Sequence, residues 1–151
     1  MIKAKVIGAG GYGGVGIIEL LHKHPEAKVS ALVDVENVGD PISKMYPHLT
    51  GFIDTRIVDA ASPEAAQPAD VVFMATPDGV GMKLAKAELA KGTKVVDYSG
   101  DFRFNTPESY AEYATRIGKS PVHASPELLP QSVYGVPELH RKQITKDTNI
   151  V

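Results

Sequence analysis

The sequence predicts an α/β fold in which a doubly wound, mostly parallel sheet is covered by helices. Apolar and β-branched runs that are typical of strands alternate along the chain with segments of helical periodicity. This alternation favours right-handed strand–helix–strand units, which build parallel sheets. A length of 151 residues is enough for one domain with a sizeable core, so we expect a single domain over residues 1–151.

The first half of the chain contains three expected strands and one long helix. Residues 3–7 form a short apolar run, and residues 28–34 are rich in β-branched side chains. Between them, residues 15–24 have a helical pattern that stops at a proline. Residues 35–52 contain two glycines, two prolines and little periodicity, which predicts a loop. A third strand is expected at residues 55–59.

The second half repeats the alternation. Residues 70–76 are almost entirely apolar, as in a strand that is buried on both faces of a parallel sheet. Thr106 and Pro107 have the residue types of a helix N-cap and a first helical position. The other expected elements are a helix closed by a glycine, a strand, two helices and a last strand, at residues 79–92, 93–100, 106–114, 137–144 and 148–151.

The composition excludes several classes of function. With 43% hydrophobic residues, 23% charged residues and a net charge of −2, the chain has no electrostatic reason to bind nucleic acid or an anionic membrane. It has no apolar stretch that would span a bilayer, and its N-terminus is typical of a strand rather than a signal peptide, so we expect a cytoplasmic protein. The absence of cysteine excludes disulfides, thiolate metal sites and a cysteine nucleophile from residues 1–151. The five histidines lack metal-ligand spacing, so no metal site is expected.

The most distinctive stretch is residues 8–16, GAGGYGGVG, which has six glycines in nine positions. It follows the first strand and opens the first helix, where a dinucleotide pyrophosphate can reach the free N–H groups and positive dipole end of the helix. A tight turn without a ligand is the alternative interpretation. The motif fits in two registers, Gly8-x-Gly10-x-x-Gly13 or Gly8-x-x-Gly11-x-x-Gly14. The expected cofactor-binding residues of the loop are Gly8, Gly10, Gly11, Tyr12, Gly13 and Gly14.

An acidic residue after the second strand supports the dinucleotide interpretation. Asp34 lies 20 residues beyond Gly14, where a carboxylate accepts hydrogen bonds from a ribose diol. The same charge repels a 2′-phosphate, and Glu36 adds to that repulsion. We therefore expect NAD or NADP as the cofactor, with NAD favoured.

Four motifs carry a resemblance to a known family: GAGGYGG, DVVFMATPDG, DYSGDFRF and YGVPEL. Over nearly its whole length the chain resembles the N-terminal domain of N-acetyl-gamma-glutamyl-phosphate reductases. The resemblance implies a Rossmann-type domain that precedes a catalytic α+β domain, and it favours the register Gly8, Gly11, Gly14. The activity that it implies is the NADPH-dependent reduction of an acyl phosphate to a semialdehyde in arginine biosynthesis, through a cysteine thioester.

The resemblance also implies where the chemistry takes place. The family's cysteine lies in an Asn-Pro-Gly-Cys motif that follows the strand at residues 148–151, so it is expected just beyond Val151. We therefore expect no catalytic residue in this chain, and we expect residues 1–151 to be inactive alone. Because the chain stops at the carboxyl end of a strand, where α/β proteins build ligand sites, we expect a fragment that lacks its C-terminal helix and catalytic domain. N-acetyl-gamma-glutamyl phosphate and a second copy of the subunit are expected partners of the complete enzyme only.

The chain departs from the family pattern at three places. Asp34 and Val35 replace the Ser-Arg pair that the family uses for the NADP 2′-phosphate, which agrees with the preference for NAD. Asp78 replaces the histidine of the family's Pro-His-Gly turn. Gly10 and Gly13 replace the more usual serine and threonine, which leaves the loop barer.

Candidate residues also follow the later strands. Thr76 and Pro77 are expected to contact the cofactor, whereas Asp78 has two open interpretations, a cofactor contact or an N-cap of the next helix. Ser99 is a further expected cofactor contact. Arg103 is expected to offer a bidentate fork to a substrate phosphate or carboxylate, and the alternative is a structural ion pair with Asp101.

The sequence is also compatible with two other functions. One is a non-catalytic NAD-binding module with a regulatory role. The other is a fragment of a related aspartate- or aminoadipate-semialdehyde dehydrogenase.

Overall fold

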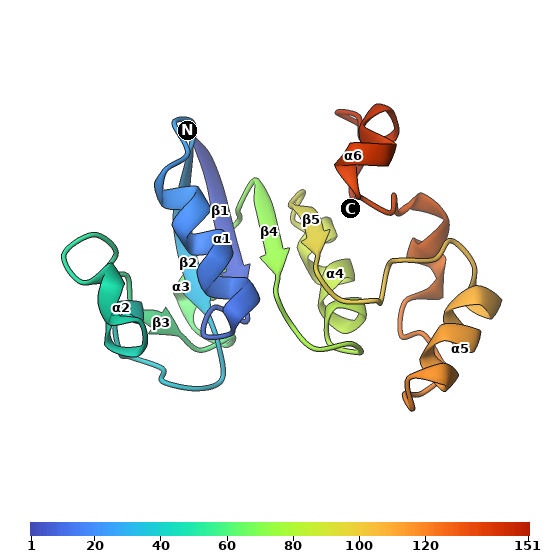
Figure 1. The fold of residues 1–151 in the computed structure, drawn as a ribbon, viewed down its shortest axis with the longest axis horizontal. Helices are drawn as coiled ribbons and strands as arrows, with labels where there is room; N and C mark the ends of the chain where they lie inside the picture. Colours follow the sequence, from blue (N-terminus) through green and yellow to red (C-terminus); the bar gives the residue numbers. More distant parts are fainter. The chain divides into compact units, whose positions relative to one another are not determined.

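The computed structural model describes all 151 residues, which divide into two units, Met1–Ala75 and Thr76–Val151. In Figure 1 the first unit runs from blue to green and the second from yellow-green to red. Each unit has its own helices and strands and is described by itself.

The first unit contains four parallel strands in the order β3-β2-β1-β4. Parallel pairing of the central strand with a neighbour on each side confirms the predicted kind of sheet. The first three strands agree with the predicted ones, although the third is shorter. The bounds are Ile2–Ile7 for β1, Ala27–Val33 for β2, Ile57–Val58 for β3 and Val71–Met74 for β4.

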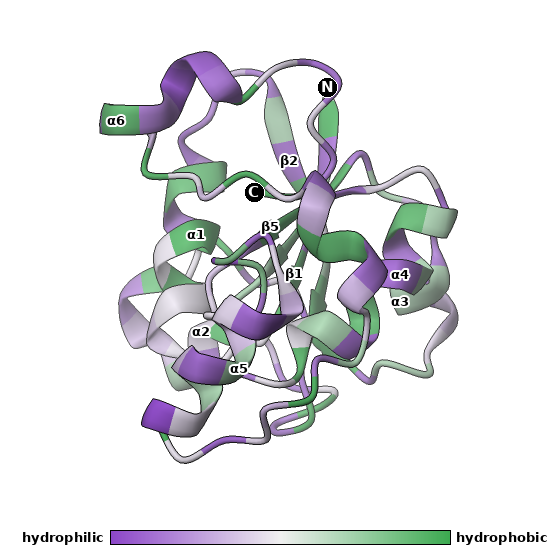
Figure 2. Ribbon diagram, turned by 90° about the vertical axis from the view of Figure 1, so that its right-hand side faces the viewer, coloured by the Kyte–Doolittle hydropathy of each residue, from purple (hydrophilic) through white to green (hydrophobic).

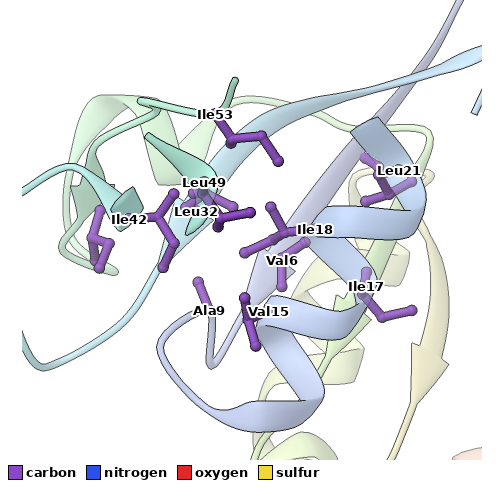
Figure 3. Packing of buried hydrophobic residues seen from close by; sticks show 12 residues of the cluster. Val6, Ala9, Val15, Ile17, Ile18, Leu21, Leu32, Ile42, Leu49 and Ile53 are labelled. Carbon is purple, nitrogen blue, oxygen red and sulfur yellow. The ribbon is translucent and has the colours of Figure 1, made fainter. Parts of the chain in front are cut away.

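The helix α1, Tyr12–His22, connects β1 to β2 and covers one face of the sheet (Figure 1). Its apolar side chains, among them Val15, Ile18 and Leu21, are buried in one cluster with Val6 and Leu32 (Figure 3). The helix begins three residues before the predicted start, at residue 12 rather than 15, because the last glycines of the loop already adopt helical geometry. The loop therefore opens directly into the helix.

The prediction of a loop at residues 35–52 is wrong, because this segment contains the helix α2, Ile42–Met45, and the 3-10 turn η1, Pro47–Leu49. Ile42 and Leu49 join the core cluster of the first unit (Figure 3). Helices of three or four residues are too short to produce an apolar periodicity, so the sequence pattern misses them.

One more short helix, α3, Pro63–Ala66, lies in the first unit. The Ser62 side chain accepts a hydrogen bond from the Ala65 N–H at 3.1 Å and so caps its start. Lys5, buried in the middle of β1, donates from its Nζ to the Ala65 carbonyl oxygen at 2.7 Å. The short helix is thereby tied to the central strand.

The second unit contains α4 and β5, followed by a segment in which short helices and 3-10 turns alternate with irregular stretches. Thr106 caps α5 as predicted, since its Oγ1 accepts from the Ser109 N–H at 3.2 Å. The helix predicted at residues 137–144 is a single turn followed by a 3-10 turn, mostly hydrophilic (Figure 2) and without a buried residue. No helix in the structure is long and apolar enough to cross a membrane. The bounds are Gly81–Ala90 for α4, Lys94–Asp97 for β5, Pro107–Arg116 for α5, Pro126–Gln131 for η2, Pro137–His140 for α6 and Arg141–Gln143 for η3.

The predicted last strand is represented by three backbone hydrogen bonds beside β5. The Val95 N–H donates to the Asn149 carbonyl oxygen at 2.8 Å, the Val151 N–H donates to the Val95 carbonyl oxygen at 2.9 Å, and the Asp97 N–H donates to the Val151 carbonyl oxygen at 2.8 Å. The bridge between Val95 and Ile150 is parallel. Residues 149–151 therefore run along β5 as a strand would, although the pairing is shorter than the prediction at 148–151.

Candidate functional site

The glycine loop turns the chain from β1 into α1. Gly8 has a φ of +81°, which side chains of L-residues rarely adopt. Its N–H donates to the Val33 carbonyl oxygen of β2 at 2.9 Å, and its own carbonyl oxygen accepts from the Gly11 N–H at 3.2 Å. Gly11 is the N-cap of α1 and has an extended backbone. The loop is thus a tight, hydrogen-bonded turn.

Gly14 allows the first turn of α1 to lie against this loop. A Cβ on Gly14 would overlap the carbonyl oxygen of Gly8 and would lie 2.8 Å from the Cα of Ala9. Both neighbours are backbone, so neither can move without opening the turn. Because Gly8 needs its φ, Gly11 caps the helix and Gly14 has no space for a side chain, the geometry favours the register Gly8-x-x-Gly11-x-x-Gly14.

The beginning of α1 is chemically suited to an anion. Its N-cap makes no side-chain hydrogen bond, and no acidic residue lies in its first turn. The first hydrogen bond of the helix is from the Val15 N–H to the Gly11 carbonyl oxygen at 2.9 Å, so the N–H groups of residues 12–14 have no intrahelical acceptor. Tyr12 is 90% exposed and Gly13 is exposed too. Free amides and a positive helix end at the surface are the features that bind a pyrophosphate.

Asp34 contacts the glycine loop directly. Its Oδ2 accepts from the Gly10 N–H at 2.8 Å, and its Oδ1 accepts from the Val35 N–H at 2.7 Å. The residue is half-buried at the end of β2, whereas Glu36 is exposed. The structure therefore brings together the loop and the acidic residue that the sequence separates by 20 positions.

Tyr46, which the sequence does not mark as a site residue, also forms a hydrogen bond with the glycine loop. It lies between α2 and η1, and its hydroxyl donates to the Gly10 carbonyl oxygen at 2.7 Å. Burial raises the pKa of Tyr46, and the Tyr12 phenol and the Asp34 carboxylate raise it further, so the hydroxyl keeps the proton that it donates. No sequence signal marks Tyr46, because the segment that carries it lacks periodicity.

In the second unit, Asp101 rather than Asp78 accepts hydrogen bonds from the backbone at the start of α4. Asp101 is wholly buried, and its carboxylate accepts from the Gly79 N–H at 2.8 Å and from the Met82 N–H at 3.0 Å at the start of α4. The N-cap interpretation of Asp78 is thus wrong. Its carboxylate instead accepts from the Gly100 N–H at 2.8 Å and from the Tyr113 hydroxyl at 2.9 Å.

Arg103 does not form the alternative ion pair with Asp101. Its guanidinium lies among three aromatic rings, with its Cζ 5.2 Å from the ring centroid of Tyr134, 5.7 Å from that of Phe104 and 6.0 Å from that of Tyr113. Cation–π contacts of this kind hold a guanidinium in place and leave its N–H groups available to an anion. Asp101 is occupied by the amides of α4, which explains why the pair is absent.

Arg103 and Ser99 line a pocket of about 390 Å³ in the second unit, together with Asp97 and Tyr134. Burial raises the pKa of Asp97 to about 6. Hydrogen bonds from Ser99 oppose this shift, whereas the charges of Asp101 and Asp78 add to it. The Ser99 hydroxyl donates to Asp97 Oδ2 at 2.7 Å, so Ser99 and Asp97 act together in the wall of the pocket.

Thr76 and Pro77 lie in the turn that precedes α4. The Thr76 Oγ1 is buried and has no hydrogen-bond partner in the structure. Pro77 is exposed, and its carbonyl oxygen accepts from the Val80 N–H at 3.2 Å. An unpaired buried hydroxyl is uncommon in folded proteins, which sets Thr76 apart from the other polar residues of this turn.

Comparison with known families assigns the chain to one of them. The sequence model of the semialdehyde dehydrogenase NAD-binding domain matches residues 3–147. The chain belongs to this family. Within it, the chain is 39% identical over 144 residues to the N-acetyl-gamma-glutamyl-phosphate reductase of Nitrosococcus oceani and 42% identical over 144 residues to that of Pseudomonas putida. Each match covers 95% of this chain and 40% of the relative, so this semialdehyde dehydrogenase NAD-binding domain spans about two fifths of their length.

Solved structures confirm the fold of the semialdehyde dehydrogenase NAD-binding domain. The aspartate semialdehyde dehydrogenase of Candida albicans, solved with NADP, matches with a TM-score of 0.57 at 22% identity over 80% of this chain and 40% of that chain. Aspartate semialdehyde dehydrogenase II of Vibrio cholerae matches with a TM-score of 0.57 at 19% identity over 77% of this chain and 36% of that chain. The predicted α/β fold class is therefore confirmed.

Proposed function

We propose that this chain is the dinucleotide-binding domain of an N-acetyl-gamma-glutamyl-phosphate reductase and that it prefers NAD to NADP. The observation that carries the proposal is the exposed, uncapped N-terminus of α1, which opens from the glycine loop beside Asp34. The names of the relatives from Nitrosococcus oceani and Pseudomonas putida support the choice of reductase. We include in the proposal that residues 1–151 act as one domain of a cytoplasmic enzyme.

The glycine loop supplies the groups that hold the pyrophosphate. In this proposal the amides of residues 12–14 donate to it, while Gly8 and Gly14 keep the turn tight enough for the backbone to approach it. Asp34 accepts hydrogen bonds from the adenosine ribose diol with the lone pairs that the N–H groups of Gly10, Val35 and Glu36 leave available. Thr76, Pro77 and Ser99 are proposed as further cofactor contacts on the basis of their positions in the segments that follow β4 and β5.

The pocket around Arg103 is the proposed substrate side of the domain. The guanidinium, oriented by its aromatic neighbours, offers two parallel N–H groups to a phosphate or carboxylate of N-acetyl-gamma-glutamyl phosphate. A nicotinamide dinucleotide supplies the hydride for such a reduction. Because residues 1–151 contain no cysteine, a thioester step is expected from a part of the enzyme outside them. The contacts of a homo-oligomer are likewise proposed for the complete enzyme only.

The preference for NAD rests on charge. A 2′-phosphate bound at the ribose would lie near the Asp34 carboxylate, and two like charges 4 Å apart repel by about 1 kcal/mol even in water, which is about fivefold in affinity. Titration calorimetry with NAD and NADP tests this. We expect NAD to bind several-fold more tightly, and we expect Asp34→Asn, which keeps an oxygen for the Gly10 N–H, to narrow the difference.

The control for this experiment is Asp147→Asn, which removes the same charge from an exposed turn and is expected to leave both affinities unchanged. Tighter binding of NADP by the unsubstituted chain would contradict the assigned preference. Absence of binding by either dinucleotide would contradict the proposed function itself.

A further inference from the structure

Two successive peptide groups of the glycine loop are held by side chains from outside it. The N–H of the Ala9–Gly10 peptide donates to Asp34 Oδ2 at 2.8 Å. The carbonyl oxygen of the next peptide, Gly10–Gly11, accepts from the Tyr46 hydroxyl at 2.7 Å, and the N–H of that same peptide donates to the Gly8 carbonyl oxygen at 3.2 Å. Both planes are therefore fixed before α1 begins.

This restraint matters because a peptide between two glycines rotates more easily than one flanked by residues with side chains. Neither Gly10 nor Gly11 has a Cβ to limit its backbone, so the unrestrained loop would sample many orientations. An anion site needs the amides that follow to point in one direction. If the loop becomes ordered only when the ligand binds, the conformational entropy that it loses weakens the affinity. A hydrogen bond that fixes the peptide in the free protein removes that loss.

Tyr46 is itself held in place by the core of the first unit. Ile42, which precedes it in the chain, is fully buried, and Leu49, which follows it, is 4% exposed (Figure 3). Tyr46 itself packs against their cluster. The Tyr46 N–H donates to the Ile42 carbonyl oxygen at 3.0 Å, and the Ile42 N–H donates to the Thr55 carbonyl oxygen at 3.0 Å. The α2–η1 segment therefore presents the Tyr46 hydroxyl to the loop from a packed base.

The position of Gly10 is also defined by contact. A Cβ on Gly10 would lie 3.1 Å from the Met45 Cε and 3.2 Å from Asp34 Oδ2. The loop backbone thus lies directly against the side chain of Met45, the last residue of α2, and against the carboxylate of Asp34. Met45 contributes a packing contact to the loop, whereas the hydroxyl of Tyr46 contributes a directional hydrogen bond.

We propose that Tyr46 is a positioning residue for dinucleotide binding, which acts by holding the Gly10–Gly11 peptide through its hydroxyl. This inference rests on the proposed function, because it assigns Tyr46 to the same cofactor site. It gives the α2–η1 segment a role in the site without any contact to the dinucleotide. The hydroxyl, rather than the aromatic ring, is the group that matters.

The test compares Tyr46→Phe with the unsubstituted chain and with Tyr110→Phe, which removes a phenol oxygen from α5 in the second unit. Titration calorimetry with NAD is expected to give an affinity about fivefold weaker for Tyr46→Phe and an unchanged affinity for Tyr110→Phe, since a net hydrogen bond typically changes an equilibrium by about two- to tenfold. The ring of Tyr46 remains, so the thermal midpoint of Tyr46→Phe is expected to stay close to that of the unsubstituted chain.

A second readout needs no ligand. The ¹⁵N chemical shift of Gly11 reports the hydrogen bond to the preceding carbonyl, so Tyr46→Phe should move the Gly11 amide signal in the free chain while Tyr110→Phe leaves it in place. Equal NAD affinity of Tyr46→Phe and the unsubstituted chain, with or without a lower thermal midpoint, would overturn this inference alone. No binding of NAD by the unsubstituted chain would overturn the proposed function and this inference with it.

Discussion

At the residue scale, the carboxyl of Asp97 illustrates how the surroundings of one side chain set its chemistry. It lies at the end of β5, where loss of water raises its pKa from 3.8 to about 6 and the charges of Asp101 and Asp78 act in the same direction. The hydrogen bonds from Ser99 offset only part of this shift. At neutral pH the charged form of Asp97 therefore has a higher free energy in the folded domain than in the unfolded chain, and it lowers the stability of the fold.

The sign of the resulting pH dependence follows from proton binding. Between pH 4 and pH 6 the folded state binds the Asp97 proton more tightly than the unfolded state, so the contribution of Asp97 to the free energy of unfolding decreases as the pH rises through this window. Asp97→Asn removes this contribution and keeps the shape of the side chain. We expect the variant to be more stable than the unsubstituted chain at pH 7, by about 1 to 3 kcal/mol at about 1.4 kcal/mol per pKa unit.

Urea unfolding at pH 4 and pH 7 measures this difference, with Asp147→Asn as the exposed control. If Asp97→Asn and the control have the same difference in stability between the two pH values, Asp97 does not titrate in the assigned way.

Single-residue partners were the least predictable feature of the site. The sequence offered Asp101 as a partner for Arg103 because the two residues are close along the chain. Asp101 is taken instead by the amides of Gly79 and Met82, and Arg103 lies over the ring of Tyr134. Such pairings depend on which distant segments the fold brings together, and a local pattern does not contain that information.

At the scale of elements, long helices and buried strands followed from the sequence. The helices α1, α4 and α5 each extend over ten residues or more, so they carry a periodic pattern, a capping residue or a closing glycine. The segment with α2 and η1 carries none of these signals, and its place in the core depends on contacts with the sheet. For that reason the glycine loop and Asp34 could be proposed from the sequence, whereas the contact of Tyr46 with the loop could not.

The packing of α1 against the glycine loop gives a prediction at this scale. Gly14→Ala would force a Cβ against the backbone of Gly8 and Ala9, so we expect a loss of about 2 kcal/mol or more in the free energy of unfolding, as for other overpacked sites. Gly16→Ala is the matched control in the same helix, because a Cβ there meets nothing within 4 Å. It is expected to stabilise the chain by about 0.5 to 1 kcal/mol through helix propensity.

Urea unfolding of the two variants measures both effects. Equal stability of Gly14→Ala and Gly16→Ala would mean that α1 does not lie against the loop as described.

At the scale of the whole molecule, the alternation of strands and helices was enough to predict the α/β class that the family match confirms. The same alternation does not distinguish a substrate, because many α/β domains share it. The proposed function therefore rests on features of each unit taken by itself. These are the free amides of α1 beside the carboxylate of Asp34 in the first unit, and the guanidinium of Arg103 in the second. The chain spans 40% of the length of these relatives, and the part that we propose for it in the reaction is to bind and orient.

Titration of the ¹⁵N-labelled chain with NAD, followed through its backbone amide signals, tests the central claim most directly. We predict that the largest shifts occur at residues 10–14 of the glycine loop and at the residues that follow Asp34, because these amides surround the proposed pyrophosphate and ribose positions. Shifts confined to other parts of the chain, or signals of the loop that stay unchanged at saturating NAD, would contradict it.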